Sequence, residues 1–286
     1  MVIKTNISSV NSNRINKYHQ LDLEKNLRNL SSGKRINQAG DDAAGFAISE
    51  KMSAQIDGIN QAERNAHDGI SFIQTTEGYI TQTNAVLRRI RELAVQTANG
   101  IYTTEDRLLA QVELSQMVAE IDRLASYAQF NGLNMLTGRF ANPVVGGTPT
   151  ASMWFHVGAN MDQRIEAFVG TMTARGLGIR DEARNFTVSL SAPEKSNQTI
   201  GIVDQAIKKV NKQLADLGAY QNRMEYVAKS QAISSENLQA SKSRIVDANM
   251  ASEVSALVKN QILHQSQTAM IAQANQKAQS VLELLR

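Results

Sequence analysis

Histidine is the residue type in this chain whose chemistry best suits proton transfer or metal binding. The four histidines, His19, His67, His156 and His264, lie far apart, and no two have the HExxH spacing that places a zinc-binding pair on one helix face. His67-Asp68 has no GxSxG nucleophile motif nearby, and no GxGxxG or GxxxxGK(S/T) loop predicts a nucleotide site. We therefore expect structural or surface roles for the histidines, with no catalytic residue, no metal and no cofactor, and no enzyme.

Cysteine content and charge exclude further kinds of site. Cysteine is absent, so neither a disulfide framework nor a thiolate metal site can form. The net charge is +3 and the sequence pI about 9.1, but no run of five or six Lys or Arg forms a nucleic-acid-binding arm. No nucleic acid is therefore expected as a partner. A basic coiled-coil nucleic-acid-binding protein is one alternative, which binding that weakens steeply with salt would support. A hydrolase is another, but it lacks any site.

The polar chemistry that does stand out is a stretch of amides near the C-terminus. Between Lys259 and Lys277 there is no Asp, Glu, Lys or Arg. A solvated helix normally carries charge on its outward face, so this composition favours a helix surrounded by other helices; a solvated, weakly polar helix is the alternative. Amides spread through the segment exclude a membrane-spanning helix. The polar residues are Asn260, Gln261, Gln265, Ser266, Gln267, Thr268, Gln273, Asn275 and Gln276.

The prolines show where long helices can form. All three, Pro143, Pro149 and Pro193, fall in one window, and proline costs about 3 kcal/mol inside a helix. Apolar periodicity predicts a first helix over 3–30 and a second over about 43–99. A capping box at 103–106 predicts the start of a third helix, whose apolar periodicity continues to Ala128. Glycines at 58, 69 and 78 leave room for a break in the second helix.

Turn signals separate these helices. Gly33 suits the end of the first helix, Asp41 and Asp42 suit the start of the second, and Asn99-Gly100 suits the turn after it. Asn131-Gly132 is expected to end the third helix.

The middle of the chain differs in character. Residues 186–190 alternate with period two and residues 165–168 do so more weakly, which predicts strands and a small β-hairpin region. Helix resumes at Pro193, and the stretch from Gly218 to Arg286, without Pro or further Gly, is interpreted as a helix. The predicted fold class is mainly α: an elongated bundle of long helices, with terminal coiled-coil arms and a helical rod, and a small β-hairpin insertion.

Several segments of the chain resemble bacterial flagellin, most closely the core flagellins of spirochaete periplasmic filaments. The N-terminal segments are 30–37, 40–45, 65–71, 91–96 and 129–132, the C-terminal ones are 260–263, 268–276 and 281–285, and a spirochaete-type segment covers 151–164. One departure is Gln267, where many relatives have Gly, which adds side-chain bulk to a closely packed arm.

The resemblance implies a domain organisation and a function. Residues 1–43 and 246–286 would be the N- and C-terminal arms of the inner coiled-coil layer of a filament. Residues 44–245 would be the rod, with a β-rich insertion at about 140–193. The chain would be a structural subunit that polymerises into a flagellar filament for motility. A flagellin-like hook–filament junction protein is the alternative within the family.

The resemblance also implies partners and a location. The partners would be further copies of the chain, the flagellar export apparatus, a secretion chaperone on the C-terminal arm, cap and hook-junction proteins, and sheath proteins, without insertion into a membrane. Residues 1–7 lack the pattern of a Sec signal peptide, which suits type III export. The small insertion suits a periplasmic filament.

Two groups of residues are the candidate sites. One group is Arg89, Leu93 and Glu113. These residues are expected either on a solvated helix face or in a contact between the rods of two subunits. The resemblance also implies that an innate immune receptor recognises similar positions in related flagellins. The expected polymerisation interface contains Ile3, Ile7, Leu27, Leu30, Val254, Leu257, Ile271, Ala278, Leu282 and Leu285.

Overall fold

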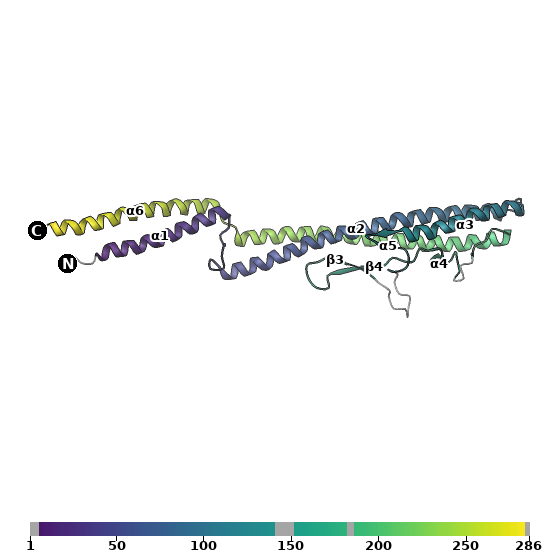
Figure 1. The fold of residues 1–286 in the computed structure, drawn as a ribbon, viewed down its shortest axis with the longest axis horizontal. Coiled ribbons are helices and arrows are strands. Elements are labelled where there is room, and N and C mark those ends of the chain that lie inside the picture. The colour runs from purple at the N-terminus through teal and green to yellow at the C-terminus, as the bar shows by residue number, and fades with distance from the viewer. Residues whose placement is uncertain (1–5, 141–151, 182–185, 284–286) are drawn as a thin grey trace. The chain divides into compact units, whose positions relative to one another are not determined.

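Long helices dominate this computed structural model, as the confinement of proline to one window predicts. The structure describes residues 6–140, 152–181 and 186–283, except for the side chains of 277–279 and 281–283. Figure 1 shows the elements in order. They are α1 (Ile7–Ser32), α2 (Ala43–Ala98), α3 (Thr104–Tyr127), β1 (Gln129–Phe130), β2 (Leu133–Asn134), β3 (Met153–His156), β4 (Arg164–Ala167), α4 (Ala174–Leu177), α5 (Pro193–Val246) and α6 (Met250–Glu283). The predicted fold class, mainly α with a small β-hairpin, is confirmed.

Local signals account for several helix ends. Gly33 follows α1 with φ +69°, a left-handed conformation that glycine adopts without strain. Thr103 and Asp106 form the predicted capping box at the start of α3. Pro193 is the first residue of α5, where its missing N–H costs nothing. α2 continues through Gly58, Gly69 and Gly78 without a break.

The C-terminal stretch contains two helices rather than one. Gly218 lies inside α5, and the chain leaves helical conformation at residues 247–249 before α6 begins. Backbone pairing causes this break, because Val246 and Asp247 lie against the segment that follows α1: Arg35 N donates to the Val246 carbonyl at 2.6 Å. The Asn249 side chain then accepts from the first backbone N–H groups of α6.

The strands differ from the prediction in two places. β3 pairs antiparallel with β4, with Trp154 opposite Glu166, so the weaker of the two predicted strands is confirmed. The stronger prediction, 186–190, is wrong, because only Phe186 makes a β-bridge, with Arg180. The backbone N–H groups of residues 189 and 190 bond instead to side chains, those of Thr199 and Gln111. After α3 the chain forms a second hairpin, β1–β2, around Asn131-Gly132, both with positive φ.

The chain divides into two compact units: residues 57–235, here called unit 2, and residues 1–56 with 236–286, called unit 1. The core of unit 2 follows a heptad pattern on each of its long helices. Buried residues recur seven apart at Ile73, Ile80, Leu87 and Ala94 on α2, at Leu114 and Ile121 on α3, and at Val203, Val210 and Leu217 on α5.

Side-chain amides attach the β3–β4 hairpin of unit 2 to the helices. Asn65 of α2 donates to the carbonyl of His156, and Gln231 of α5 donates to that of Val157. Gln213 of α5 both donates to the Phe168 carbonyl and accepts from the N–H of residue 170. Four backbone groups at the end of β3 and in the residues flanking the two strands are therefore satisfied by helix side chains rather than by further strands.

Candidate functional site

The candidate site lies in unit 1, where α1 and α6 run side by side in opposite directions (Figure 1). At one end of the pair Asn6 donates to the backbone carbonyl of Ala274 at 3.0 Å. At the other end Asn29 donates to the carboxylate of Glu253 at 3.4 Å. Between them Gln267 donates to the Ser12 carbonyl at 3.3 Å, so the bulk that this residue adds is accommodated by a contact between the helices.

The less exposed side of each helix carries many polar residues. Along both α1 and α6, buried or half-buried residues recur every three or four positions, which is the spacing of a seam between two helices. Of these residues only Asn29 is buried, while the others are half-buried. The polar members are Ser9, Ser12, Asn16, His19, Asn26 and Asn29 on α1, and Glu253, Asn260, His264 and Gln267 on α6.

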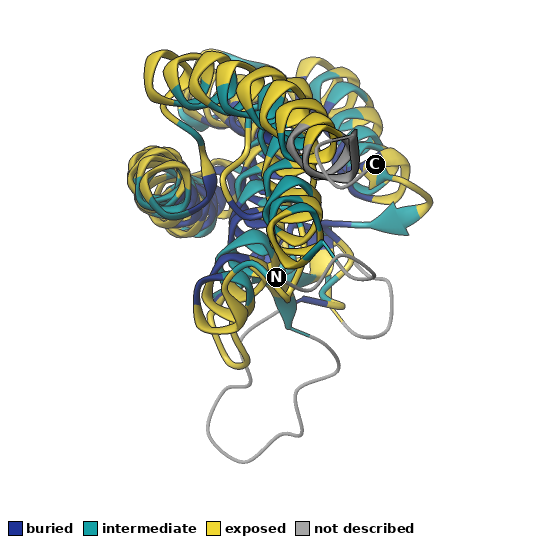
Figure 2. Cartoon of the chain, turned by 90° about the vertical axis from the view of Figure 1, so that its left-hand side faces the viewer, coloured by how far each residue is buried: buried dark blue, intermediate teal, exposed yellow. Residues whose placement is uncertain are grey.

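Large apolar side chains lie on the outer side of the pair instead. On α1 they are Ile7, Val10, Tyr18, Leu21 and Leu27, each 48 to 70% exposed. On α6 they are Met250, Val254, Val258, Ile262 and Met270, each 44 to 60% exposed. We call the first four of these residues the α6 stripe. In Figure 2 the two helices that lead to the N and C labels are correspondingly coloured as exposed over much of their surface. The seam of the pair is thus of mixed polarity, because Leu23, Leu30, Leu257, Leu263 and Ile271 are also half-buried there. Each helix in addition leaves large apolar side chains on its outer side, which a self-sufficient helical hairpin would bury.

The ten residues of the expected polymerisation interface fall into three groups. Ile7, Leu27 and Val254 are exposed. Leu30, Leu257 and Ile271 are half-buried, on the side of the helices with the polar seam. Ile3 and Leu285 lie outside the described residues, as do the side chains of Ala278 and Leu282 on α6.

The polar residues of the amide-rich stretch, 260–276, lie on both the half-buried and the exposed sides of α6. Asn260 and Gln267 are half-buried, whereas Gln261, Gln265, Thr268 and Gln273 are exposed. Most of its amides and hydroxyls therefore face away from α1, on the same sides of α6 that carry exposed apolar residues.

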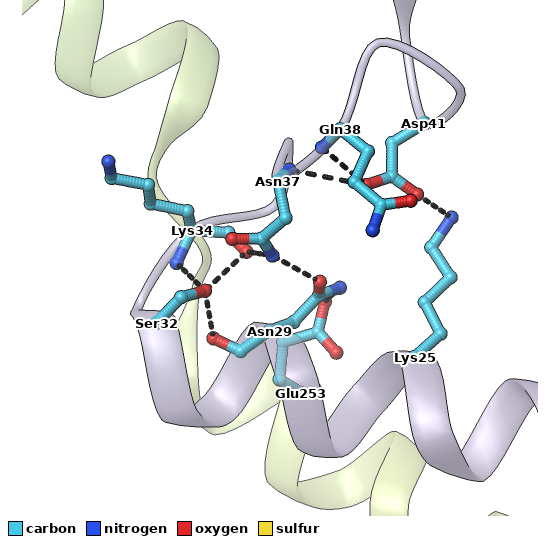
Figure 3. A network of polar contacts seen from close by, with 8 residues as sticks. All are labelled: Lys25, Asn29, Ser32, Lys34, Asn37, Gln38, Asp41 and Glu253. Atoms are coloured by element: carbon cyan, nitrogen blue, oxygen red, sulfur yellow. Dashed lines mark hydrogen bonds and ion pairs between the residues drawn. The ribbon is translucent and has the colours of Figure 1, made fainter.

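A polar network connects α1, the segment 33–42 and α6, as Figure 3 shows. Asn29 is 3% exposed. Its side-chain carbonyl accepts from the Asn37 amide at 2.9 Å, and its own amide faces Glu253. Asn37 also donates to the Lys34 carbonyl at 2.9 Å, so two acceptors hold its amide in place.

Asp41 ties the same segment to α1. Its carboxylate pairs with Lys25 at 3.1 Å and accepts from the backbone N–H groups of Asn37 and Gln38, both at 3.2 Å (Figure 3). These contacts, that with Lys25 first, lower the pKa of Asp41 below its ordinary value. Asp42 instead accepts from the N–H of residue 45 and caps α2, so only one of the two predicted capping carboxylates has that role.

Sequence reasoning missed this network. The sequence marks residues 30–37 and 40–45 as family motifs, and Gly33, Asp41 and Asp42 as helix-end signals. No periodicity, however, marks a buried Asn on a helix that also carries other amides. The one available signal was that Asn37 and Asp41 stand four apart in a loop next to Gly33, a common setting for side-chain-to-backbone bonds.

In unit 2 the structure brings together two residues of the second candidate site but not the third. Arg89 on α2 pairs with Glu113 on α3 at 3.0 Å, and both are exposed or half-buried. Leu93 is 3% exposed and belongs to the core, so it cannot be a contact residue while the bundle is folded. At the end of α2, in the turn that follows it and at the start of α3, the structure exposes apolar residues that the sequence analysis did not single out. They are Val95, Ile101, Leu108, Leu109 and Val112.

The described part of the chain offers little for other chemistry. Its His, Asp and Glu side chains form no group of three that could hold a metal ion. Nor does any helix in the described ranges combine the length and apolar content that crossing a membrane requires.

Comparison with protein families identifies the two ends of the chain. The model of the bacterial flagellin N-terminal helical region matches residues 3–141, and that of the bacterial flagellin C-terminal helical region matches residues 200–285. The chain belongs to the bacterial flagellins. The arrangement of α1 with α6 is therefore a feature of a flagellin, formed by both matched regions.

Relatives match this flagellin over its full length. It is 59% identical over 286 residues to the flagellar filament 33 kDa core protein of Treponema phagedenis, covering all of both chains. It is 56% identical to a flagellar filament core protein of Brachyspira hyodysenteriae, again over all of both chains.

A solved structure of a flagellar hook-associated protein from Vibrio parahaemolyticus resembles it with a TM-score of 0.58. The likeness covers 72% of this flagellin and 100% of that chain at 13% identity, so it concerns the fold alone.

Proposed function

We propose that this flagellin is a structural subunit that polymerises with copies of itself into a flagellar filament for motility. Its family and its full-length likeness to proteins named as filament core proteins support this role. The single observation that carries it in the structure is the outward apolar surface of the α1–α6 pair. A hook–filament junction protein is less well supported, because the hook-associated structure shares only the fold.

The exposed apolar surface is large enough to matter energetically. Burying one Val, Leu, Ile or Phe side chain is worth about 1.5–3 kcal/mol, and each helix of the pair exposes five large apolar residues among those described. Part of this gain offsets the entropy lost on association. Because α1 and α6 expose different residues, a copy can offer one helix to one neighbour and the other helix to another. Such heterologous contacts generate helical polymers.

Contacts between rods would add to those between the terminal helices. The exposed apolar residues around the α2–α3 turn, together with the Arg89–Glu113 pair, form a mixed surface suited to a second copy. The terminal arms (1–43 and 246–286) and the rod (44–245) would then contribute separate layers of the filament. No catalytic step is part of this role, which is mechanical: the filament transmits torque.

The filament's location and partners follow from the same assignment. A periplasmic filament, with type III export, a chaperone on the C-terminal arm, cap and junction proteins, and sheath proteins, is consistent with spirochaete relatives of equal length. The short insertion at about 140–193 supports it, because it leaves no large outer domain.

Electron microscopy of the purified protein after addition of filament seeds tests the polymer role. Tubes that lengthen with added protein are expected, and a variant lacking residues 254–286 should remain as free protein at the same concentration. Tubes of normal diameter from the truncated chain would contradict the role of α6. Failure of the full chain to elongate any seed would contradict the function.

A further inference from the structure

We infer that Asn99, in the turn between α2 and α3, is a site of spontaneous deamidation, and that the fold of this turn promotes the reaction. Asn99 and Gly100 directly follow α2, and both are exposed. An Asn followed by Gly is the pair in which this reaction is least hindered, because glycine has no side chain to shield its backbone nitrogen. The chain contains two such pairs, at 99–100 and at 131–132, so they can be compared within one molecule.

The reaction needs only water. The backbone nitrogen of Gly100 attacks the side-chain carbon Cγ of Asn99, and the Cγ–Nδ2 bond breaks. Ammonia leaves, and the proton that the Gly100 nitrogen gives up leaves with it by way of water. Water then opens the resulting cyclic imide at either of its two carbonyls, which leaves aspartate or isoaspartate at position 99. The net change replaces a neutral amide by a carboxylate.

The turn holds the reacting atoms together and places a donor where charge develops. The backbone N–H of Ile101 donates to Oδ1 of Asn99 at 3.4 Å, which closes an Asx turn. Cγ and the Gly100 nitrogen both lie within the ring that this hydrogen bond closes. As the nitrogen attacks, negative charge develops on Oδ1, and a hydrogen bond of this length tightens as its acceptor gains charge. The Gly100 N–H itself makes no hydrogen bond to another described residue.

Arg107 activates the attacking nitrogen. Its guanidinium donates to the backbone carbonyl of Asn99 at 3.0 Å and to that of Thr97 at 3.2 Å, and the side chain is only 7% exposed. The Asn99 carbonyl and the Gly100 N–H belong to the same peptide group, whose oxygen and nitrogen share charge by resonance. A cation at the oxygen therefore makes this N–H a better acid, and loss of its proton is required for the attack.

The second Asn-Gly pair lies in the loop of the β1–β2 hairpin, where the fold opposes the reaction. Asn131 has φ +48° and Gly132 has φ +75°, and the paired residues Phe130 and Leu133 hold the loop on both sides. In the left-handed conformation the nitrogen of the following residue points away from Cβ, so the ring can close only if the loop leaves that conformation. Asn99 has no such restriction, because its φ is not positive.

Deamidation would place a carboxylate among exposed apolar side chains. Val95 precedes Asn99 by about one helical turn, Ile101 follows it and is 80% exposed, and Leu108 is the neighbour of Arg107. This part of the inference rests on the proposed function, in which these apolar residues contact a second copy. Burial of the new charge in that contact is costly, so free subunits should lose the ability to assemble as they age.

Mass spectrometry of the ageing chain tests the modification. Tryptic peptides 92–107 and 124–139 separate Asn99 from Asn131, and deamidation of each is followed in the folded chain and in urea at the same mildly alkaline pH. The folded chain should react severalfold faster at Asn99 than at Asn131, and in urea the two rates should become similar. Equal rates in the folded chain, or an equally large excess at Asn99 in urea, would overturn the inference.

Two substitutions at position 101 isolate the hydrogen-bond donor. Ile101→Pro removes the N–H that faces Oδ1 and should slow deamidation at Asn99, whereas Ile101→Val keeps this N–H and should leave the rate unchanged. Asn131 reports on folding in the same sample, because unfolding would speed its reaction. An Ile101→Pro chain that reacts at Asn99 as fast as the wild type, with Asn131 unchanged, would show that the turn does not promote the reaction.

Seeded elongation tests the consequence for assembly. Gly100→Ala adds a Cβ with nothing within 4 Å, so it should fold normally and deamidate slowly. After ageing, the wild type should elongate seeds severalfold more slowly than Gly100→Ala, and fresh Asn99→Asp should resemble the aged wild type. Undiminished elongation by Asn99→Asp would remove the effect on assembly. If the fresh wild type elongates no seed, the proposed function fails, while the mass spectrometry still decides whether Asn99 is the modified site.

Discussion

The backbone N–H of Arg35 donates to the backbone carbonyl of Val246, although more than 200 residues separate them along the chain. The Arg35 guanidinium adds a hydrogen bond to the carbonyl of Ile245 at 2.8 Å. These bonds satisfy carbonyls at the end of α5 that have no partner within the helix. The segment after α1 and the junction of α5 with α6 are therefore held together.

Acid should release the segment 33–42 through Asp41. A carboxylate whose pKa is lowered by folding stabilises the protein fully above its unfolded pKa, about 3.9 for Asp, and that contribution is lost as the pH falls through the folded value. The amide shifts of Asn37 and Gln38, followed by NMR, should titrate with a midpoint below the ordinary one. Lys25→Met should raise that midpoint. The same midpoint in both proteins would show that Lys25 does not hold the carboxylate.

Two glycines of α2 should respond oppositely to alanine. A Cβ at Gly78 meets nothing within 4 Å, so Gly78→Ala should raise the free energy of unfolding by about 0.5–1 kcal/mol. A Cβ at Gly69 would lie 2.7 Å from the sulfur of buried Met224 and 3.1 Å from Phe155, so Gly69→Ala should lower it by about 1–3 kcal/mol. Denaturant unfolding measures both. Equal gains would mean that the side chains of Met224 and Phe155 move aside freely.

Charge on the α6 stripe should block assembly without unfolding the chain. Val258→Asp places a carboxylate on an exposed site, so monomer helicity should be unchanged, but burial of that charge against a second copy would be costly. Seeded elongation, followed by light scattering, should fall to background. Val258→Leu keeps the site apolar and should elongate normally. Normal growth of Val258→Asp would remove Val258 from the interface.

Arg89 and Arg91 make a matched pair for testing the rod contact. Each makes an exposed ion pair, Arg89 with Glu113 and Arg91 with Asp204, and exposed pairs contribute little to stability. Thermal unfolding should therefore change little for Arg89→Ala or Arg91→Ala. Elongation should slow by a factor of a few for Arg89→Ala only, if Arg89 contacts a second copy. Equal elongation rates would leave both residues on a solvated face.

Much of the helical fold could be predicted because its signals are local. Proline-free ends, the Gly33 stop and the Thr103–Asp106 capping box need only neighbouring residues to act. The break at 247–249 could not be predicted in this way. It contains neither Gly nor Pro, and it depends on backbone pairing with a segment more than 200 residues earlier.

Alternation between apolar and polar residues predicted burial better than it predicted strands. Val188 and Leu190 are both buried, as the pattern of 186–190 indicates. A strand also needs a neighbour for its backbone groups, and here Thr199 and Gln111 take that place.

The candidate site was only partly predictable for a related reason. The apolar residues of both arms are evident in the sequence, but which of them face the other helix is settled by contacts between distant segments. Asn29, for example, has one partner in a loop, Asn37, and another near the far end of the chain, Glu253.

The antiparallel pairing of α1 with α6 also sets the exposed apolar residues of the two helices at matching heights. On α1 they run from Ile7 to Leu27, and on α6 from Met250 to Met270, so both sets extend along most of the pair. Two subunits that point the same way can therefore stand level while the apolar residues of one meet those of the other. Any lengthwise step between neighbouring molecules must then come from contacts elsewhere on the chain.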